Sequence, residues 1–145
     1  MFSETKITVR YQETDKMGIV HHSVYPIWFE CGRTDFIQRA GITYSRMESE
    51  GVRLPLLGLK CRYLYPSFYE DEMLVKTSIQ NLTPTRISFC YEIYRKNYIK
   101  PVVTGETEHV WVDNNLKPVN MKKYKPQMYQ IISDVFNRKG IVANG

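Results

Sequence analysis

Residues 10–25 read Arg-Tyr-Gln-Glu-Thr-Asp-Lys-Met-Gly-Ile-Val-His-His-Ser-Val-Tyr, a glycine-containing stretch without helical or strand periodicity. The segment before it, residues 5–11, alternates between apolar and polar side chains. This alternation predicts a half-buried strand with Ile7, Val9 and Tyr11 on its inner face. The quoted stretch is therefore predicted to be a loop that leads from a first strand into whatever structure follows.

A long helix is predicted to follow this loop. Between Ser23 and Ala40, apolar side chains recur at three- and four-residue steps, as expected for one buried helix face: Val24, Ile27, Trp28, Cys31, Phe36, Ile37 and Ala40. Ser23 is the predicted N-cap, and Gly41 stands where a helix C-terminus favours glycine. Glu30 and Arg33 have the spacing of an ion pair along the helix.

The rest of the chain is predicted to be mainly extended. Strands are expected over residues 54–65, 72–82, 86–95 and 102–112, and residues 44–51 form either a short helix or an irregular loop. Residues 126–137 carry one apolar face, which predicts a terminal helix. Because strands dominate and the helices lie at the ends of the strand block, the pattern is that of a single α+β domain over residues 1–145.

Composition narrows the class of protein. The chain has 145 residues, 43% hydrophobic and 24% charged, which is enough for a globular core. No apolar run approaches the roughly 20 residues that span a bilayer, and no secretory signal begins the chain, so we expect a cytoplasmic protein without a membrane segment. Cys31, Cys61 and Cys90 are then expected to be reduced, buried thiols. The net charge of +5 is compatible with an anionic partner but does not indicate which kind.

Several common kinds of site have no motif in this sequence. Glycine-rich phosphate loops and the GxSxG of serine hydrolases are absent, and the three histidines lack zinc-like spacing. We therefore expect no metal and no cofactor, and no nucleic-acid partner, because no such binding motif is present. Asp15 has two interpretations from the residues alone. It is either a turn-forming aspartate or a carboxylate that activates water beside the N-terminus of the helix.

The loop and the helix resemble the hotdog-fold acyl-CoA thioesterases, in particular the group that includes 4-hydroxybenzoyl-CoA thioesterase and the Tol–Pal-associated thioesterases. The resemblance rests on Tyr11, Asp15, Gly18, Ile19, Val20, Tyr25 and Glu30-x-x-Arg33. Residues 63–75 add a second match, with a strand, a proline turn, an acidic pair and another strand. The resemblance implies a hotdog fold, in which a curved antiparallel sheet of about five strands wraps a long central helix, here with a C-terminal helix added. It also implies a homodimer or homotetramer with active sites at the subunit interface.

The resemblance further implies a mechanism and a set of site residues. Asp15 would act as general base or as nucleophile, the backbone N–H of His22 would polarise the thioester carbonyl, and Gly18 would permit the tight turn. The implied substrate-binding residues are Tyr25, Val20, Arg62, Arg86 and Lys60, the last three toward coenzyme A phosphates. Coenzyme A is then part of the substrate. Many relatives have Asn at the position of Val24, which leaves the acyl preference open.

Two other functions remain compatible with the same resemblance. One is hydrolysis of acyl-carrier-protein thioesters, for which the chemistry is equal and the partner is an acidic protein. The other is a hotdog protein that binds acyl-CoA without turnover.

Overall fold

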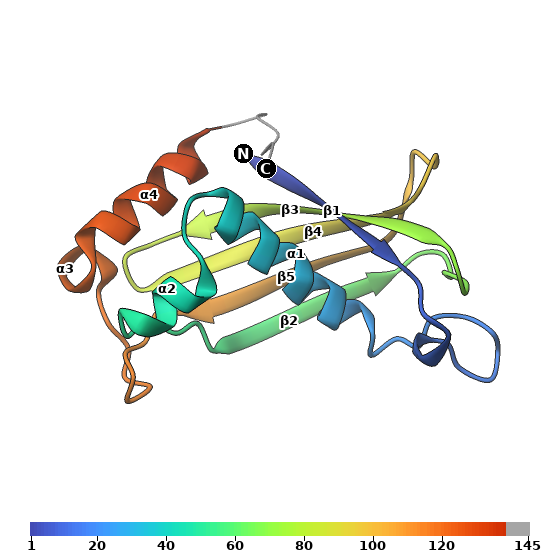
Figure 1. Ribbon diagram of the computed structural model, residues 1–145, viewed down its shortest axis with the longest axis horizontal. Coiled ribbons are helices and arrows are strands. Elements are labelled where there is room, and N and C mark those ends of the chain that lie inside the picture. The colour runs from blue at the N-terminus through green and yellow to red at the C-terminus, as the bar shows by residue number, and fades with distance from the viewer. Residues whose placement is uncertain (139–145) are drawn as a thin grey trace.

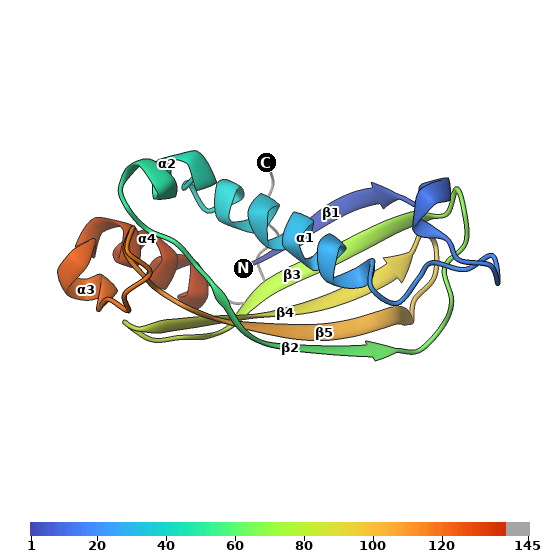
Figure 2. The ribbon, with the colours of Figure 1, turned by 90° about the horizontal axis from the view of Figure 1, so that it is seen from below.

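The computed structural model describes residues 1–138, which form one antiparallel sheet and the helices packed on it. The strand order is β1-β3-β4-β5-β2. The strands are β1 (Phe2–Thr8), β2 (Leu56–Tyr63), β3 (Glu72–Leu82), β4 (Arg86–Arg95) and β5 (Pro101–Val110). The helices are α1 (Tyr25–Arg39), α2 (Tyr44–Ser49), α3 (Met121–Tyr124) and α4 (Pro126–Asn137). Figure 1 and Figure 2 show α1 lying along one face of the curved sheet, so the predicted α+β hotdog fold is confirmed.

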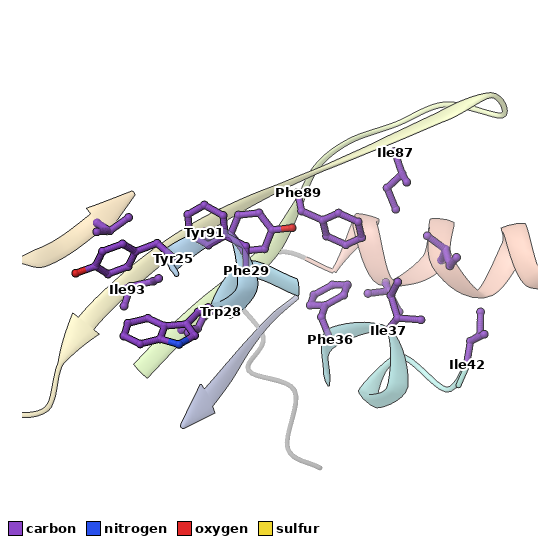
Figure 3. Packing of buried hydrophobic residues seen from close by; sticks show 14 of the residues in the cluster. Tyr25, Trp28, Phe29, Phe36, Ile37, Ile42, Ile87, Phe89, Tyr91 and Ile93 are labelled. Atoms are coloured by element: carbon purple, nitrogen blue, oxygen red, sulfur yellow. The ribbon is translucent and has the colours of Figure 1, made fainter. Parts of the chain in front are cut away.

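The core forms where α1 meets the sheet. Phe29 stacks on Tyr91 of β4 with ring centroids 4.4 Å apart, and Phe36 meets Phe89 edge-on at 6.1 Å (Figure 3). Each such aromatic pair adds about 0.5–1.5 kcal/mol to the free energy of unfolding beyond its buried area. The large aromatic side chains of α1 therefore fix its position on β4 and β5.

The helix can approach the sheet closely because β5 carries a glycine beneath it. A side-chain carbon on Gly105 would overlap the Phe29 ring and would lie 2.8 Å from the Lys60 carbonyl oxygen. Only glycine leaves room for the Phe29 ring at this position.

The predicted buried stripe of α1 is partly wrong. The side chains that face the sheet come from Tyr25, Phe29 and Phe36, whereas Ile27 and Cys31 lie on the outer side and are exposed. The helix has apolar residues on both sides, so the periodicity could not tell the sheet-facing side from the outer one.

The ends of the helix also differ in detail from the prediction. The residue at the N-cap position is Val24, so the predicted N-cap Ser23 is wrong, and its hydroxyl instead lies 2.8 Å from His21 Nδ1. Gly41 follows the helix with φ of +109°, as predicted. Among residues 1–138, Glu30 forms no ion pair with Arg33, so the pair that the spacing predicted is wrong.

The first strand lies nearer the N-terminus than predicted. It ends at Thr8, and Tyr11 lies in a short 3-10 helix, Tyr11–Glu13, with 73% of its surface exposed. The inner-face positions of Ile7 and Val9 are confirmed, since Val9 is buried and Ile7 half-buried. Cys61 and Cys90 are only half-buried and Cys31 is exposed, so the expectation of buried thiols is wrong.

The remaining elements agree with the alternation and periodicity of the sequence. β3, β4 and α4 have the predicted bounds, and residues 44–49 are the helical alternative of the two predicted there. The apolar face of α4 buries Met128, Ile132 and Val135. Among residues 1–138, no helix has the length and apolar character needed to cross a bilayer.

Candidate functional site

The loop between β1 and α1 folds into a small hairpin. Thr14 and Val20 form an antiparallel bridge, and the Asp15 N–H donates to the Ile19 carbonyl at 2.9 Å. At the tip, the Gly18 N–H donates to the Asp15 carbonyl at 3.0 Å, with Gly18 at φ +79°. This left-handed conformation strains other residues, which explains glycine at this position. The hairpin fixes the backbone on both sides of Asp15.

One carboxylate oxygen of Asp15 helps to build this turn. Oδ1 accepts a hydrogen bond from the Met17 N–H at 2.8 Å, the geometry of an Asx-turn. Within residues 1–138, Oδ2 has no hydrogen-bond partner, and the side chain is half-buried. Asp15 is therefore a turn-forming aspartate that also keeps one oxygen available for another group.

The backbone just before α1 offers a free donor. The N–H groups of the flanking residues are occupied: His21 donates to the Glu13 carbonyl, and Ser23 donates to the His21 ring nitrogen at 3.2 Å. In the described chain, the His22 N–H donates to no acceptor. A free main-chain donor near a helix N-terminus is suited to stabilising negative charge on an oxygen.

A buried carboxylate, which the sequence analysis did not single out, holds this loop against the helix. Glu13 is only 5% exposed and accepts from the Arg10 N–H at 2.8 Å and from Trp28 Nε1 at 2.9 Å. Burial alone raises the pKa of Glu13, but these hydrogen bonds and the Arg10 guanidinium outweigh it, and the pKa is lowered. Glu13 thus remains ionised and fixes the loop. Glu13 and Trp28 are 15 positions apart, and no helical or strand periodicity relates such distant positions. The sequence alone therefore does not indicate that they contact each other.

Two tyrosines line the other side of the loop. Tyr63 of β2 donates to the His22 carbonyl at 3.0 Å, and its ring lies 5.7 Å from that of Tyr25. The buried Tyr25 hydroxyl donates to Ser67 Oγ at 3.1 Å. The hydrogen bond with Cys61, together with partial burial, raises the pKa of Tyr63 to about 12, so its hydroxyl stays protonated as a donor at neutral pH. Tyr63 was part of the matched second block but was not predicted as a site residue.

The structure brings some of the predicted site residues together. Asp15, Gly18, Val20, His22 and Tyr25 all lie in the loop or at its junction with α1. The Val20 and Tyr25 side chains are buried in the core, where each has a packing role. Their predicted contact with substrate stays a prediction.

The three basic residues predicted to contact coenzyme A lie elsewhere. Lys60 and Arg62 alternate with the inward-facing Cys61 and are exposed on the face of the sheet away from α1. Arg86 begins β4, at the end of the sheet far from the loop, and pairs with Glu108 at 2.9 Å. Within one chain, these residues are not part of the loop site. Among residues 1–138, no three His, Cys, Asp or Glu side chains cluster so that they could hold a metal ion.

Comparison with known proteins identifies the family. A model of the thioesterase-like superfamily matches residues 9–130. The putative acyl-CoA thioesterase YneP of Bacillus subtilis (strain 168) is 34% identical over 128 residues, which are 88% of this chain and 92% of that protein. The chloroplastic acyl-acyl carrier protein thioesterase ATL3 of Arabidopsis thaliana is 29% identical over 120 residues, 83% of this chain and 63% of that protein.

A solved structure agrees with this assignment. The DHNA-CoA thioesterase from Staphylococcus aureus superposes with a TM-score of 0.87 at 34% identity and covers 92% of this chain and 90% of its own. The chain therefore belongs to the thioesterase-like superfamily of hotdog proteins, and it is a thioester hydrolase.

Proposed function

We propose that the chain hydrolyses acyl-CoA thioesters at the loop between β1 and α1. The observation that carries this proposal is that a carboxylate oxygen of Asp15 and the N–H of His22 are both free on one loop that Glu13 holds against α1. The Asp15 carboxylate either takes a proton from the attacking water or attacks the carbonyl itself. The His22 N–H stabilises the negative charge that develops on the carbonyl oxygen. A thiolate leaves readily, so no further acid is needed.

The names of the relatives support coenzyme A esters as substrates, with thioesters of acyl carrier protein as the alternative. The Bacillus relative is named an acyl-CoA thioesterase and the Staphylococcus structure a DHNA-CoA thioesterase. These names favour coenzyme A, with an aryl acyl group as one class to test. The Arabidopsis relative acts, by its name, on acyl-acyl carrier protein. Carrier-protein thioesters are therefore the second candidate.

We also propose that the chain forms a homodimer through β2. This strand ends the sheet, and its inward-facing apolar residues are uncovered: Leu56 is 51% exposed, Leu59 44% and Tyr63 49%. An end strand with exposed apolar side chains favours pairing with another strand. An antiparallel β2–β2 pair between two copies would cover these residues and extend the sheet.

The experiment measures thiol release from a panel of short-chain, long-chain and aryl acyl-CoA esters, with wild type beside Asp15→Asn. In the variant, the side-chain amide oxygen can still accept from the Met17 N–H, so the turn is kept while the carboxylate is lost. We expect a rate loss of about 100-fold or more. The matched control is Asp113→Asn, because Asp113 makes the same type of turn contact with the Asn115 N–H at 2.8 Å. A fully active Asp15→Asn enzyme would contradict the mechanism.

A wild-type enzyme that is inactive on the whole panel would be tested next on acyl-carrier-protein esters. Turnover there would favour the second candidate. Tight acyl-CoA binding without turnover of either substrate would contradict hydrolysis and favour a binding role.

A further inference from the structure

The direction of the His22 N–H is set by two consecutive peptide groups. The first joins His21 to His22 and carries this N–H, and its carbonyl oxygen accepts from the Val24 N–H at 3.0 Å. The second joins His22 to Ser23, and its N–H donates to the His21 ring nitrogen at 3.2 Å. Because peptide groups are planar, holding both of them fixes the two backbone torsion angles of His22.

A further hydrogen bond to these peptide groups comes from the sheet. Tyr63, the last residue of β2, donates its hydroxyl proton to the His22 carbonyl oxygen at 3.0 Å. The two bonds described above join residues that lie within four positions of one another, whereas Tyr63 is 41 positions from His22. Tyr63 therefore ties the direction of the His22 N–H to the sheet.

The Tyr63 ring is itself held in place by aromatic contacts. It meets the Tyr25 ring edge-on with centroids 5.7 Å apart, and the His22 ring at 6.4 Å. Tyr25 is only 3% exposed, and its hydroxyl donates to Ser67 Oγ. The Tyr63 hydroxyl thus has a defined position relative to the start of α1.

Stability alone does not account for the hydrogen bond between Tyr63 and His22. His22 is exposed, so water can bond to its carbonyl oxygen, and Tyr63 is 49% exposed. A hydrogen bond that replaces one with water adds little to the free energy of unfolding. It does restrict the direction of the peptide group, and direction strongly affects the rate when a donor must meet charge that develops on an oxygen.

We propose that Tyr63 is a positioning residue for thioester hydrolysis. Its hydroxyl holds the peptide group between His22 and Ser23, and this directs the His22 N–H toward the thioester carbonyl oxygen. The gain is largest in the transition state, where the oxygen carries the most charge. The inference rests on the proposed function and adds to it a residue of β2 that acts through the main chain and exchanges no proton.

The first test is Tyr63→Phe, which removes the hydroxyl and keeps the ring with its contact to Tyr25. With the acyl-CoA ester that wild type hydrolyses fastest, we expect kcat to fall about tenfold with KM nearly unchanged, a smaller loss than removal of the donor itself would cause. The hydrogen bond with Cys61, together with partial burial, raises the pKa of Tyr63 to about 12. Because the hydroxyl stays protonated between about pH 6 and 9, the pH profile of kcat should keep its shape in the variant.

The matched control is Tyr124→Phe. Tyr124 of α3 donates to the Gly51 carbonyl oxygen at 3.0 Å, which is the same kind of bond, and α3 lies at the end of the sheet opposite the loop (Figure 1). We expect this variant to retain the wild-type kcat. Rates are compared at a temperature at which circular dichroism shows all the proteins folded.

An infrared measurement reports on the donor directly. The same acyl-CoA ester, labelled with ¹³C at the thioester carbonyl, is bound to Asp15→Asn with and without Tyr63→Phe. A directed hydrogen bond from the His22 N–H lowers the carbonyl stretching frequency. We expect the lowered band in Asp15→Asn to move back toward its frequency in water when Tyr63→Phe is added, and to stay in place when Tyr124→Phe is added.

The outcomes are distinct. A lower kcat at unchanged KM, together with the shifted carbonyl band, supports the proposal. A wild-type kcat in Tyr63→Phe, a higher KM at unchanged kcat, or a changed pH profile overturns the positioning role, while an inactive Asp15→Asn enzyme still supports hydrolysis at the loop. An active Asp15→Asn enzyme overturns the proposed function itself.

Discussion

The Trp28 indole N–H donates to Glu13 Oε2 at 2.9 Å, which ties the N-terminal part of the central helix to a residue two positions before Asp15. Both side chains are buried, Trp28 at 2% and Glu13 at 5% exposure. Glu13 also accepts a hydrogen bond from the Arg10 N–H, so it connects the end of the first strand, the loop and the helix. The position of the candidate catalytic loop therefore depends on one ionised carboxylate inside the core.

Replacing Glu13 with Ala should damage both stability and activity. The change leaves the buried Trp28 indole N–H without its acceptor, which costs about 1–3 kcal/mol, and it also removes the part-buried hydrogen bond from the Arg10 N–H. We expect a loss of this size in the free energy of unfolding by urea titration, together with slower thioester hydrolysis. Glu13→Gln keeps one acceptor oxygen and should lie between wild type and Ala. A Glu13→Ala protein with wild-type stability would contradict this role.

The approach of α1 to β5 gives a second prediction. Gly105→Ala places a methyl group against the Phe29 ring and the Lys60 carbonyl, so the helix or the strand must move. Such overpacking costs about 1–3 kcal/mol. The matched control is Gly58→Ala, because a side-chain carbon there meets no atom of residues 1–138 within 4 Å. Thermal unfolding of both variants should show a lower Tm for Gly105→Ala alone, and equal Tm values would refute the packing argument.

The strands could be predicted from the sequence better than the side of α1 that packs on the sheet. β3 and β4 alternate clearly because one face is buried and the other exposed, and their bounds were predicted. On α1, the apolar Ile27 lies on the exposed side, while the buried Gly32 gives no hydrophobic signal. Which side of such a helix faces the sheet depends on tertiary packing, which the local sequence does not contain.

The candidate site shows the same limit. Asp15 and Gly18 could be found because a turn and a family motif both lie in the local sequence. Glu13 and Tyr63 could not, because their partners Trp28 and His22 are 15 and 41 positions away. Their roles exist only once the loop has folded against the helix and β2.

Acid should destabilise the protein through His109. Burial, and then the nearby Arg33 charge, lower the pKa of His109 to about 4 in the folded state, against an ordinary value of 6.5. As the pH falls below 6.5, the unfolded chain binds a proton at this histidine and the folded chain does not. The free energy of unfolding therefore decreases by up to about 1.4 kcal/mol per pH unit until the pH approaches 4. Above pH 6.5 this contribution is fully present.

The measurement is urea unfolding of wild type and His109→Gln at intervals between pH 7 and pH 4.5. Carboxylates titrate in both proteins, so only the difference between the two stability curves reports on His109. We expect the stability of wild type relative to the variant to decrease steadily as the pH is lowered. A constant difference would mean that His109 is protonated equally in the folded and unfolded states.

The exposed edge of β2 gives the last prediction. Leu59 lies near the middle of the strand and faces inward, yet α1 does not cover it. If two copies pair through β2, Leu59→Glu places two carboxylates close together in an apolar interface, and the dimer should dissociate. Because the resemblance to hotdog thioesterases implies active sites at the subunit interface, the monomer should also lose activity. Sedimentation velocity of wild type and variant measures the association.

The control for this change is Ile99→Glu, which adds the same charge to an apolar side chain that is 93% exposed in the turn between β4 and β5. It should leave both the mass in solution and the activity unchanged, since Ile99 lies outside β2. A dimeric Leu59→Glu protein would show that the copies associate through another surface, or that β2 pairs without burying this side chain. A monomeric wild type with full activity would remove the need for any contribution from a partner.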